Sequence, residues 1–322
     1  MERESWRQIQ RESFSKISEI AEFLELDEEK RGKLLVKAGF PFLLPRRIAE
    51  KIDKNSLNCP IGKQFLPLQE ELVQSQGFVA SPTCDASFQK EGKILHKYEG
   101  RLLLIASGAC AMHCRYCFRQ NFSYPESSSG FTKELDYIKN NPSLHEVILS
   151  GGDPLSLSDV QLERLLLELE TIPHLQIIRF HTRFPIGIPE RISPTFLKLL
   201  KHVKKQIVFV IHANHYSEFD LDIFKALKSI QSLGIPTLMQ TVLLKGINDD
   251  LPSLKELFLN TSAKGVIPYY LHKLDQVSGT SHFEVALEKG RYLIEELRKV
   301  LPGYAVPRFA QEVPFKPYKT LL

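Results

Sequence analysis

The chain has 322 residues, of which 43% are hydrophobic and 25% are charged, and its formal net charge is +4. This length suits one α/β barrel or two small domains, and a charge this small without a dense Lys/Arg stripe predicts no nucleic-acid partner. No apolar run approaches a membrane span, the N-terminus has no signal-peptide core, and five cysteines, three of them clustered, suit a reducing compartment. We therefore expect a cytoplasmic protein with no membrane contact.

Residues 1 to about 55 are predicted to be helical. Apolar side chains recur at near-helical spacing over residues 6–23, and Asp27 is expected to start a second helix. Acidic and basic residues are mixed along this segment, so we expect it to pack on the following domain rather than on a membrane.

Residues 56–96 are predicted to be irregular, because they contain several Pro, Gly and Ser residues. Cys59 and Cys84 lie here, apart from the other cysteines, and are interpreted as structural. The expected organisation is an N-terminal helical and irregular extension of residues 1–95, followed by a domain of residues 96–322.

Beyond Arg101, six β-rich runs alternate with six helical patterns. The expected strands are 102–106, 146–149, 177–180, 207–211, 237–244 and 266–271, and the expected helices are about 132–140, 158–170, 193–202, 221–233, 251–259 and 283–300. Alternation this regular argues for parallel strands with crossover helices. Six such units favour an α/β fold of the partial (β/α)6 barrel type, with a doubly wound open sheet as the alternative.

Polar side chains stand directly after most of these strands. They are Cys110 and the residues after it, Ser150–Asp153, His181–Arg183, His212–Asn214, and His272 with Asp275. In parallel barrels the catalytic groups lie on the C-terminal face, so these side chains are expected to border one cleft. His181, Arg183, His212 and His215 are each candidates for ligand contact there, and a structural role is the alternative for each.

The stretch SGACAMHCRYCFRQNF, residues 107–122, carries Cys110, Cys114 and Cys117 in the spacing Cys-x3-Cys-x2-Cys. A structural zinc site needs four ligands, and a [4Fe–4S] cluster is normally held by four thiolates. Three thiolates would leave one iron open to a substrate or cosubstrate. The alternatives are a zinc site completed by His113 or a distant cysteine, and three unrelated buried cysteines.

This spacing resembles that of the radical S-adenosylmethionine (radical SAM) enzymes, and SGGDP, which follows one β-α unit later, resembles their Gly-Gly-acid stretch. The resemblance implies a [4Fe–4S] cluster on the three cysteines, with S-adenosylmethionine chelated at the open iron. It also implies that Ser150, Gly151, Gly152 and Asp153 hold the methionyl ammonium and that His212 contacts S-adenosylmethionine. A tight turn is the alternative reading of SGGDP alone.

Further segments resemble those of the lysine 2,3-aminomutases in the same order. They are HKYEGRLLL, CRYCFR, LSGGDPL, MQTVLLKGIND and YYLHKLDQVSGTSHF, and the resemblance covers roughly residues 58–320.

This resemblance implies that pyridoxal 5′-phosphate (PLP) and L-lysine bind the chain. Lys97, Tyr98 and Arg101 match residues that cradle the PLP phosphate, although the family has arginine at the position of Lys97, and Gln240 matches a residue near PLP. Arg119 and Asp275 match residues that bind the carboxylate and the side-chain ammonium of the substrate, and such opposite charges would fix the register of lysine. A charged strand entrance and surface ion pairs are the alternatives.

The family also has a lysine that holds PLP near the end of the chain. Here the end reads EVPFKPYKTLL, so Lys319 is the match and Lys316 the alternative, and the glycine-rich run that precedes this lysine in the family is absent. Glu312 stands where the enzymes that act on free lysine carry a second aspartate for the substrate ammonium.

Glu312, the phrase YYLHKLD and the shortness of the chain resemble the branch of the family that serves elongation factor P. The resemblance implies an isomerase that converts L-α-lysine to (R)-β-lysine, which a separate lysyl ligase attaches to elongation factor P, and it implies a reducing electron donor. The alternatives are an aminomutase that makes free β-lysine, one that acts on another amino acid such as glutamate, and a non-catalytic metal-binding module. Glutamate is disfavoured because Asp275 and Glu312 would face its side-chain carboxylate.

Overall fold

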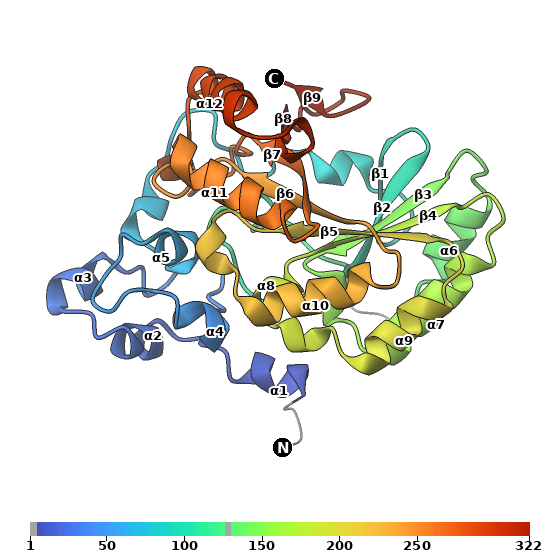
Figure 1. Ribbon diagram of the computed structural model, residues 1–322, viewed down its shortest axis with the longest axis horizontal. Coiled ribbons are helices and arrows are strands. Elements are labelled where there is room, and N and C mark those ends of the chain that lie inside the picture. Colours follow the sequence, from blue (N-terminus) through green and yellow to red (C-terminus); the bar gives the residue numbers. More distant parts are fainter. Residues whose placement is uncertain (1–4, 126–129) are drawn as a thin grey trace.

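A curved sheet organises the molecule in the computed structural model, which describes residues 5–125 and 130–322 (Figure 1). In these residues the sheet has nine strands in the sequential order β1 to β9. The strands are β1 (Ile94–Tyr98), β2 (Arg101–Ser107), β3 (Glu146–Gly151), β4 (Ile177–Thr182), β5 (Gln206–His212), β6 (Thr237–Val242), β7 (Ile267–His272), β8 (Arg308–Gln311) and β9 (Thr320–Leu321). Strands β2 to β8 are parallel, whereas β1 and β9 are antiparallel to their neighbours.

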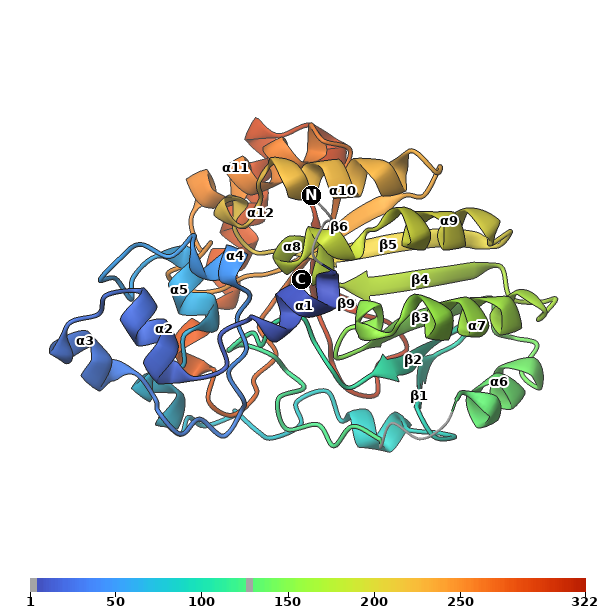
Figure 2. The same cartoon turned by 90° about the horizontal axis from the view of Figure 1, so that it is seen from below.

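One helix follows each strand from β2 to β7, and these helices cover the outer face of the sheet (Figure 2). They are α6 (Thr132–Lys139), α7 (Asp159–Glu170), α9 (Pro194–His202), α10 (Leu221–Gln231), α11 (Leu251–Ser262) and α12 (Leu287–Val300), and the short helix α8 (Phe184–Gly187) precedes α9. The predicted partial (β/α)6 barrel is thereby confirmed. A doubly wound sheet would reverse its strand order at one point, and this sheet does not.

The chain also adds strands that the sequence did not predict. After α12 it forms β8 beside β7, and β9 then folds back on β8. Both strands are short and have little alternation of apolar and polar residues. Pairing with the exposed edge of β7 therefore determines their conformation more than their own sequence pattern does.

In the part that the structure describes, the N-terminal extension contains five short α-helices packed beside the barrel (Figure 1). They are α1 (Trp6–Arg11), α2 (Ile17–Phe23), α3 (Glu28–Lys33), α4 (Arg46–Ala49) and α5 (Pro60–Phe65). The prediction of Asp27 as a helix start is confirmed, since its carboxylate caps α3 by accepting a hydrogen bond from Lys30 N at 2.9 Å.

Two predictions for the extension are wrong in detail. The apolar pattern over residues 6–23 is divided between α1 and α2, because Phe14 exchanges backbone hydrogen bonds with Leu44 and is extended there. The segment expected to be irregular contains α5, which starts at Pro60 and is capped by Cys59, whose Sγ accepts from Gly62 N at 3.2 Å. Cys59 is therefore structural, as predicted.

The hydrophobic core is continuous between the extension and the barrel. Buried leucines of α7, such as Leu162 and Leu166, join the same cluster as Ile20 of α2 and Phe65 of α5. Across β4 and β5 the rings of Phe180 and Phe209 stack with centroids 4.8 Å apart. Each fully buried side chain of this size contributes roughly 1.5–3 kcal/mol, so the extension is held firmly against the barrel.

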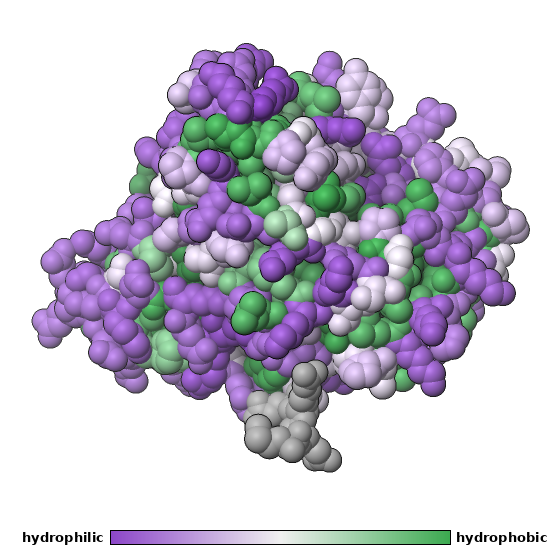
Figure 3. All heavy atoms as spheres, in the orientation of Figure 1, coloured by the Kyte–Doolittle hydropathy of each residue, from purple (hydrophilic) through white to green (hydrophobic). Residues whose placement is uncertain are grey.

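The outer surface is mostly polar in the view of Figure 3, with small apolar areas between the charged side chains. Of the helices in the described residues, none is both long and apolar enough to cross a membrane.

Candidate active site

The carboxyl ends of the parallel strands surround a cavity of about 290 Å³. It is lined by every residue that the sequence analysis assigned to a cofactor, a metal or the substrate, namely Lys97, Tyr98, Arg101, Cys110, Cys114, Cys117, Arg119, Ser150, Gly151, Gly152, Asp153, His212, Gln240, Asp275, Glu312 and Lys319. The strand pattern explains this convergence. In β4, for example, Phe180 is buried in the hydrophobic core, whereas the next side chain, His181, lines the cavity.

The three cysteines lie on the loop after β2, and the N-terminal extension holds this loop in place. His113 N donates to Leu43 O at 2.9 Å, and Arg115 N donates to Gln64 O at 2.9 Å. The Arg115 side chain is buried, and its guanidinium binds both carboxylate oxygens of Glu71, which belongs to the extension. The extension therefore fixes the backbone that presents the thiols.

The thiols themselves fit a cluster of several irons. Burial raises the pKa of Cys110, and burial together with the neighbouring Cys114 raises that of Cys117 to about 11. The positive charge of bound iron would remove this penalty on the thiolates. No three His, Cys, Asp or Glu side chains in residues 5–125 and 130–322 are arranged to share one metal ion.

The SGGDP stretch packs directly against this cysteine loop. A Cβ atom on Gly152 would lie 2.4 Å from Ala109 O, and one on Gly151, whose φ is +116°, would lie 2.3 Å from Ser107 O. Only glycine permits this approach.

Asp153 braces the end of β4. Its carboxylate accepts hydrogen bonds from Thr182 Oγ1 at 2.8 Å, Arg183 N at 2.7 Å and Leu155 N at 3.0 Å. Burial raises its pKa to about 6, although these hydrogen bonds oppose the shift. The expected contact between this stretch and S-adenosylmethionine stays a prediction.

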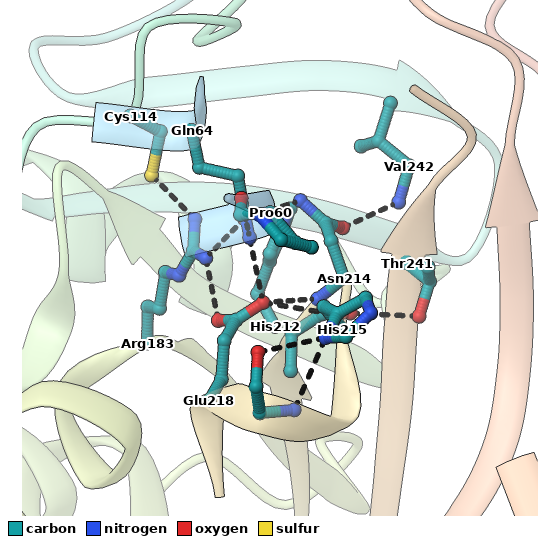
Figure 4. A network of polar contacts seen from close by, with 12 residues as sticks. Pro60, Gln64, Cys114, Arg183, His212, Asn214, His215, Glu218, Thr241 and Val242 are labelled. Carbon is teal, nitrogen blue, oxygen red and sulfur yellow. Dashed lines mark hydrogen bonds and ion pairs between the residues drawn. The ribbon is translucent and has the colours of Figure 1, made fainter. Parts of the chain in front are cut away.

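A buried polar network lies beneath the cysteine loop (Figure 4). Arg183 at the end of β4 donates to Cys114 Sγ at 2.7 Å and to Glu218 Oε2 at 2.6 Å, and it also contacts the Tyr116 hydroxyl. His212 Nε2 lies 3.0 Å from that hydroxyl, and burial with the nearby Arg183 charge holds the pKa of His212 well below its usual range. His212 is thus a neutral imidazole in the cavity wall. His215 lies outside the cavity, with Nδ1 2.7 Å from Ser217 Oγ.

A chain of alternating charges crosses the opposite wall. Arg119 Nε and Lys97 Nζ each lie 2.7 Å from a different oxygen of Asp85. Glu312 accepts hydrogen bonds from Tyr98 at 2.7 Å and from Lys319 at 2.8 Å. Lys97 and Tyr98, which are candidates for contact with the PLP phosphate, therefore each contact a carboxylate. The same holds for Arg119, the candidate for the substrate carboxylate.

Two charges in this cavity remain unbalanced. Among the described residues no carboxylate makes an ion pair with Arg101, whose guanidinium lies over the Tyr98 ring. Asp275 likewise has no side-chain hydrogen bond or ion pair within the described part of the chain, and burial raises its pKa to about 6 despite the nearby Lys319. Among the described residues that line the cavity, Arg101 is thus a cation without a paired carboxylate, and Asp275 is a carboxyl group without a paired cation.

The two lysines near the end of the chain differ in position. Lys319 lines the cavity, and its side chain is 29% exposed. Lys316 is exposed at the tip of the β8–β9 connection and lies outside the cavity. The placement favours Lys319 as the lysine that would hold PLP.

Several polar residues at this site were missed by the sequence analysis. They are Gln64, Glu71, Asp85, Asn214 as a network member, and Glu218. Each of these residues is distant from its partner in the sequence and contacts it only in the folded chain, so no local sequence spacing predicts the contact.

Comparisons with known proteins agree with this geometry. The model of the radical SAM superfamily matches residues 104–258. The L-lysine 2,3-aminomutase of Haemophilus influenzae is 38% identical over 324 aligned residues, which cover 99% of this chain and 96% of that protein. The Escherichia coli protein of the same name is 37% identical, with 99% of this chain and 95% of that protein covered. That of Clostridium subterminale is 32% identical, with 96% and 75% covered. The chain therefore belongs to the L-lysine 2,3-aminomutase family, a family of isomerases within the radical SAM superfamily.

Proposed function

We propose that this enzyme converts L-α-lysine to (R)-β-lysine for the modification of elongation factor P, with a [4Fe–4S] cluster, S-adenosylmethionine and PLP. The observation that carries the proposal is the pair of unbalanced charges in the cavity, the Arg101 guanidinium and the Asp275 carboxyl group. A ligand set with a phosphate at one point and an ammonium at another would balance both charges.

The residues divide into three sets in this proposal. Cys110, Cys114 and Cys117 would hold the cluster, and Ser150, Gly151, Gly152, Asp153 and His212 would contact S-adenosylmethionine. Lys97, Tyr98, Arg101, Gln240 and Lys319 would hold PLP. Arg119, Asp275 and Glu312 would hold L-lysine. When bound, the cluster, S-adenosylmethionine and PLP would supply one-electron chemistry and a π-system for the movement of the amino group from Cα to Cβ.

The side chains of this enzyme would mainly bind and orient. Arg119 would take the carboxylate of lysine, while Asp85 holds its guanidinium in one direction through the bond at Nε. Asp275 would take the side-chain ammonium. Fixing both ends of lysine would hold its Cβ in one orientation, and orientation of this kind contributes to catalysis.

The role of Glu312 supports the link with elongation factor P. Its carboxylate accepts hydrogen bonds from Tyr98 and Lys319, so a substrate ammonium would share it with these two partners. Glu312 is also longer than the aspartate that the resemblance assigns to the free-lysine enzymes at this position.

The test is to supply the purified product to elongation factor P together with its lysyl ligase, beside an equal concentration of L-α-lysine. We expect the product to be attached faster, as measured by the mass of intact elongation factor P over time. Equal rates for the two would contradict the proposed pathway and favour production of free β-lysine. A non-catalytic metal-binding module would release no 5′-deoxyadenosine from S-adenosylmethionine.

A further inference from the structure

The guanidinium of Arg183 lies between one cysteine of the triad and a buried acid. Its Nη1 atom is 2.7 Å from Cys114 Sγ, and its Nη2 atom is 2.6 Å from Glu218 Oε2. The Arg183 side chain is 8% exposed and that of Glu218 is 0% exposed. Figure 4 shows Cys114 and Glu218 on opposite sides of the guanidinium.

The surrounding residues fix this orientation. Gln64 Oε1 accepts from Arg183 Nη2 at 2.9 Å, and Glu218 Oε1 accepts from the backbone N atoms of Asn214 at 2.7 Å and His215 at 2.9 Å. Gln64 and Glu218, the two partners of Nη2, thus belong to elements other than β4 and fix the orientation of the guanidinium. In this orientation its Nη1 atom points toward the Cys114 thiol. Buried polar networks of this kind rigidify the side chains that form them.

We propose that Arg183 is a positioning residue that raises the reduction potential of the cluster through its hydrogen bond and charge at Cys114. The inference rests on the proposed function, because it requires a cluster on the three cysteines. Reduction adds one electron from a low-potential one-electron donor, and no bond is formed or broken in that step. The added negative charge is stabilised by a nearby cation and by N–H donors to the ligating sulfur.

Glu218 opposes this effect from the far side of the guanidinium. Because Glu218 bonds to Nη2 and Cys114 to Nη1, the positive end of the pair is nearer to the sulfur. The pair therefore acts as a dipole whose positive end faces the cluster. Removing the Arg183 charge should lower the reduction potential, and removing the Glu218 charge should raise it.

The test is an anaerobic redox titration of the reconstituted full-length protein, followed by electron paramagnetic resonance, with the iron content measured for each variant. The variants are Arg183→Gln, Glu218→Gln and the double variant. At a fixed ambient potential we expect Arg183→Gln to lower the reduced-to-oxidised ratio about tenfold, which is about 59 mV for one electron. Glu218→Gln should raise the ratio, and the double variant should lie between Arg183→Gln and the wild type.

The matched control is Arg179→Gln. Arg179 lies within β4, its side chain is 13% exposed, and it pairs with Glu146, the first residue of β3, away from the carboxyl ends of the strands. Its removal should leave the potential unchanged. Arg183→Lys keeps the charge and should lie closer to the wild type than Arg183→Gln, which gives a reading even if the glutamine variant fails to fold.

The results separate the two claims. If the wild type binds a cluster but Arg183→Lys, Glu218→Gln and the double variant show no shift, or shifts of one sign, this inference is overturned. If the wild type binds no cluster on the three cysteines, the proposed function is overturned and this inference falls with it.

Discussion

Lys319 and Glu312 face each other across the final hairpin, with Nζ 2.8 Å from Oε2. Strands β8 and β9 set this contact, because they pair Gln311 with Thr320, and Glu312 and Lys319 are the residues adjacent to that pair in the chain. Burial raises the pKa of Glu312, but the Lys319 charge and the bonds from Lys319 and Tyr98 outweigh burial, so the net pKa is below its usual value. Glu312 is therefore an ionised carboxylate that keeps Lys319 in the cavity.

Replacing Lys319 by alanine should abolish retention of PLP. An amine is needed to attach PLP to the chain, and Lys319 is the lysine placed for it. After incubation with PLP and reduction with borohydride, mass spectrometry should find PLP on the wild type and on Lys316→Ala, but not on Lys319→Ala. Covalent PLP on Lys319→Ala and its loss from Lys316→Ala would reverse the assignment.

The affinity for lysine should fall at acid pH because of Asp275. Burial raises its pKa to about 6, so the ionised form that binds an ammonium predominates only above that pH. Well below the pKa, the ionised fraction falls about tenfold for each pH unit, and the KM for lysine should rise in parallel. In Asp275→Asn the KM should be high and should lose this dependence. A wild-type KM that is flat across about pH 5 to 8 would contradict the role of Asp275.

The same shift has a consequence for stability. The pKa of Asp275 is raised from its ordinary value of 3.8 to about 6 on folding. Its protonated form therefore favours the folded state at low pH, and this contribution is lost as the pH rises to about 6. The free energy of unfolding, measured in urea, should not show this loss in Asp275→Asn. The stability of Asp275→Asn relative to the wild type should therefore increase as the pH rises through this range.

Breaking the ion pair beneath the cysteine loop should destabilise the fold. Arg115 is 1% exposed and Glu71 is 9% exposed, so Glu71→Ala leaves a buried guanidinium without its anion. Removal of one partner of a buried pair costs about 3–5 kcal/mol. Glu70→Ala, a change at the exposed neighbour, should alter the free energy of unfolding by no more than about 0.5 kcal/mol. Equal effects of the two changes in urea unfolding would show that the pair does not anchor the loop.

Substituting Gly152 should disturb the cysteine loop. The new Cβ atom would lie 2.4 Å from Ala109 O and 2.7 Å from Gly108 O, so the loop must move. We expect Gly152→Ala to bind less iron on reconstitution than the wild type. Gly303→Ala is the control, since a Cβ atom there would meet nothing within 4 Å. Full iron content in Gly152→Ala would show that the loop tolerates the displacement.

The repeating part of the fold could be predicted from the sequence, because each strand and helix carries its own periodicity. The predicted run 207–211 became β5 and the predicted helix 158–170 became α7, each within one residue at either end. The predicted strand 237–244 ended early, because Leu244 N bonds to Asn248 Oδ1 instead of a neighbouring strand. Local bonds of this kind leave no trace in hydrophobic spacing.

The polar framework of the site could not be predicted in the same way. Glu218 lies 35 residues from Arg183, and Gln64 lies 119 residues from it. Asp85, which binds both Lys97 and Arg119, is in a segment without regular pattern. Their partnerships arise when the extension and the strand ends meet, whereas motif residues such as Cys110 and Asp153 are marked by sequence spacing alone.

The most direct test of the central claim is a chiral amino-acid analysis of the reaction product. The reconstituted protein is incubated without oxygen with L-lysine, PLP, S-adenosylmethionine and a strong reductant. We expect (R)-β-lysine to form, and to form only when S-adenosylmethionine is supplied. The (S) enantiomer, or release of 5′-deoxyadenosine without any β-lysine, would contradict it.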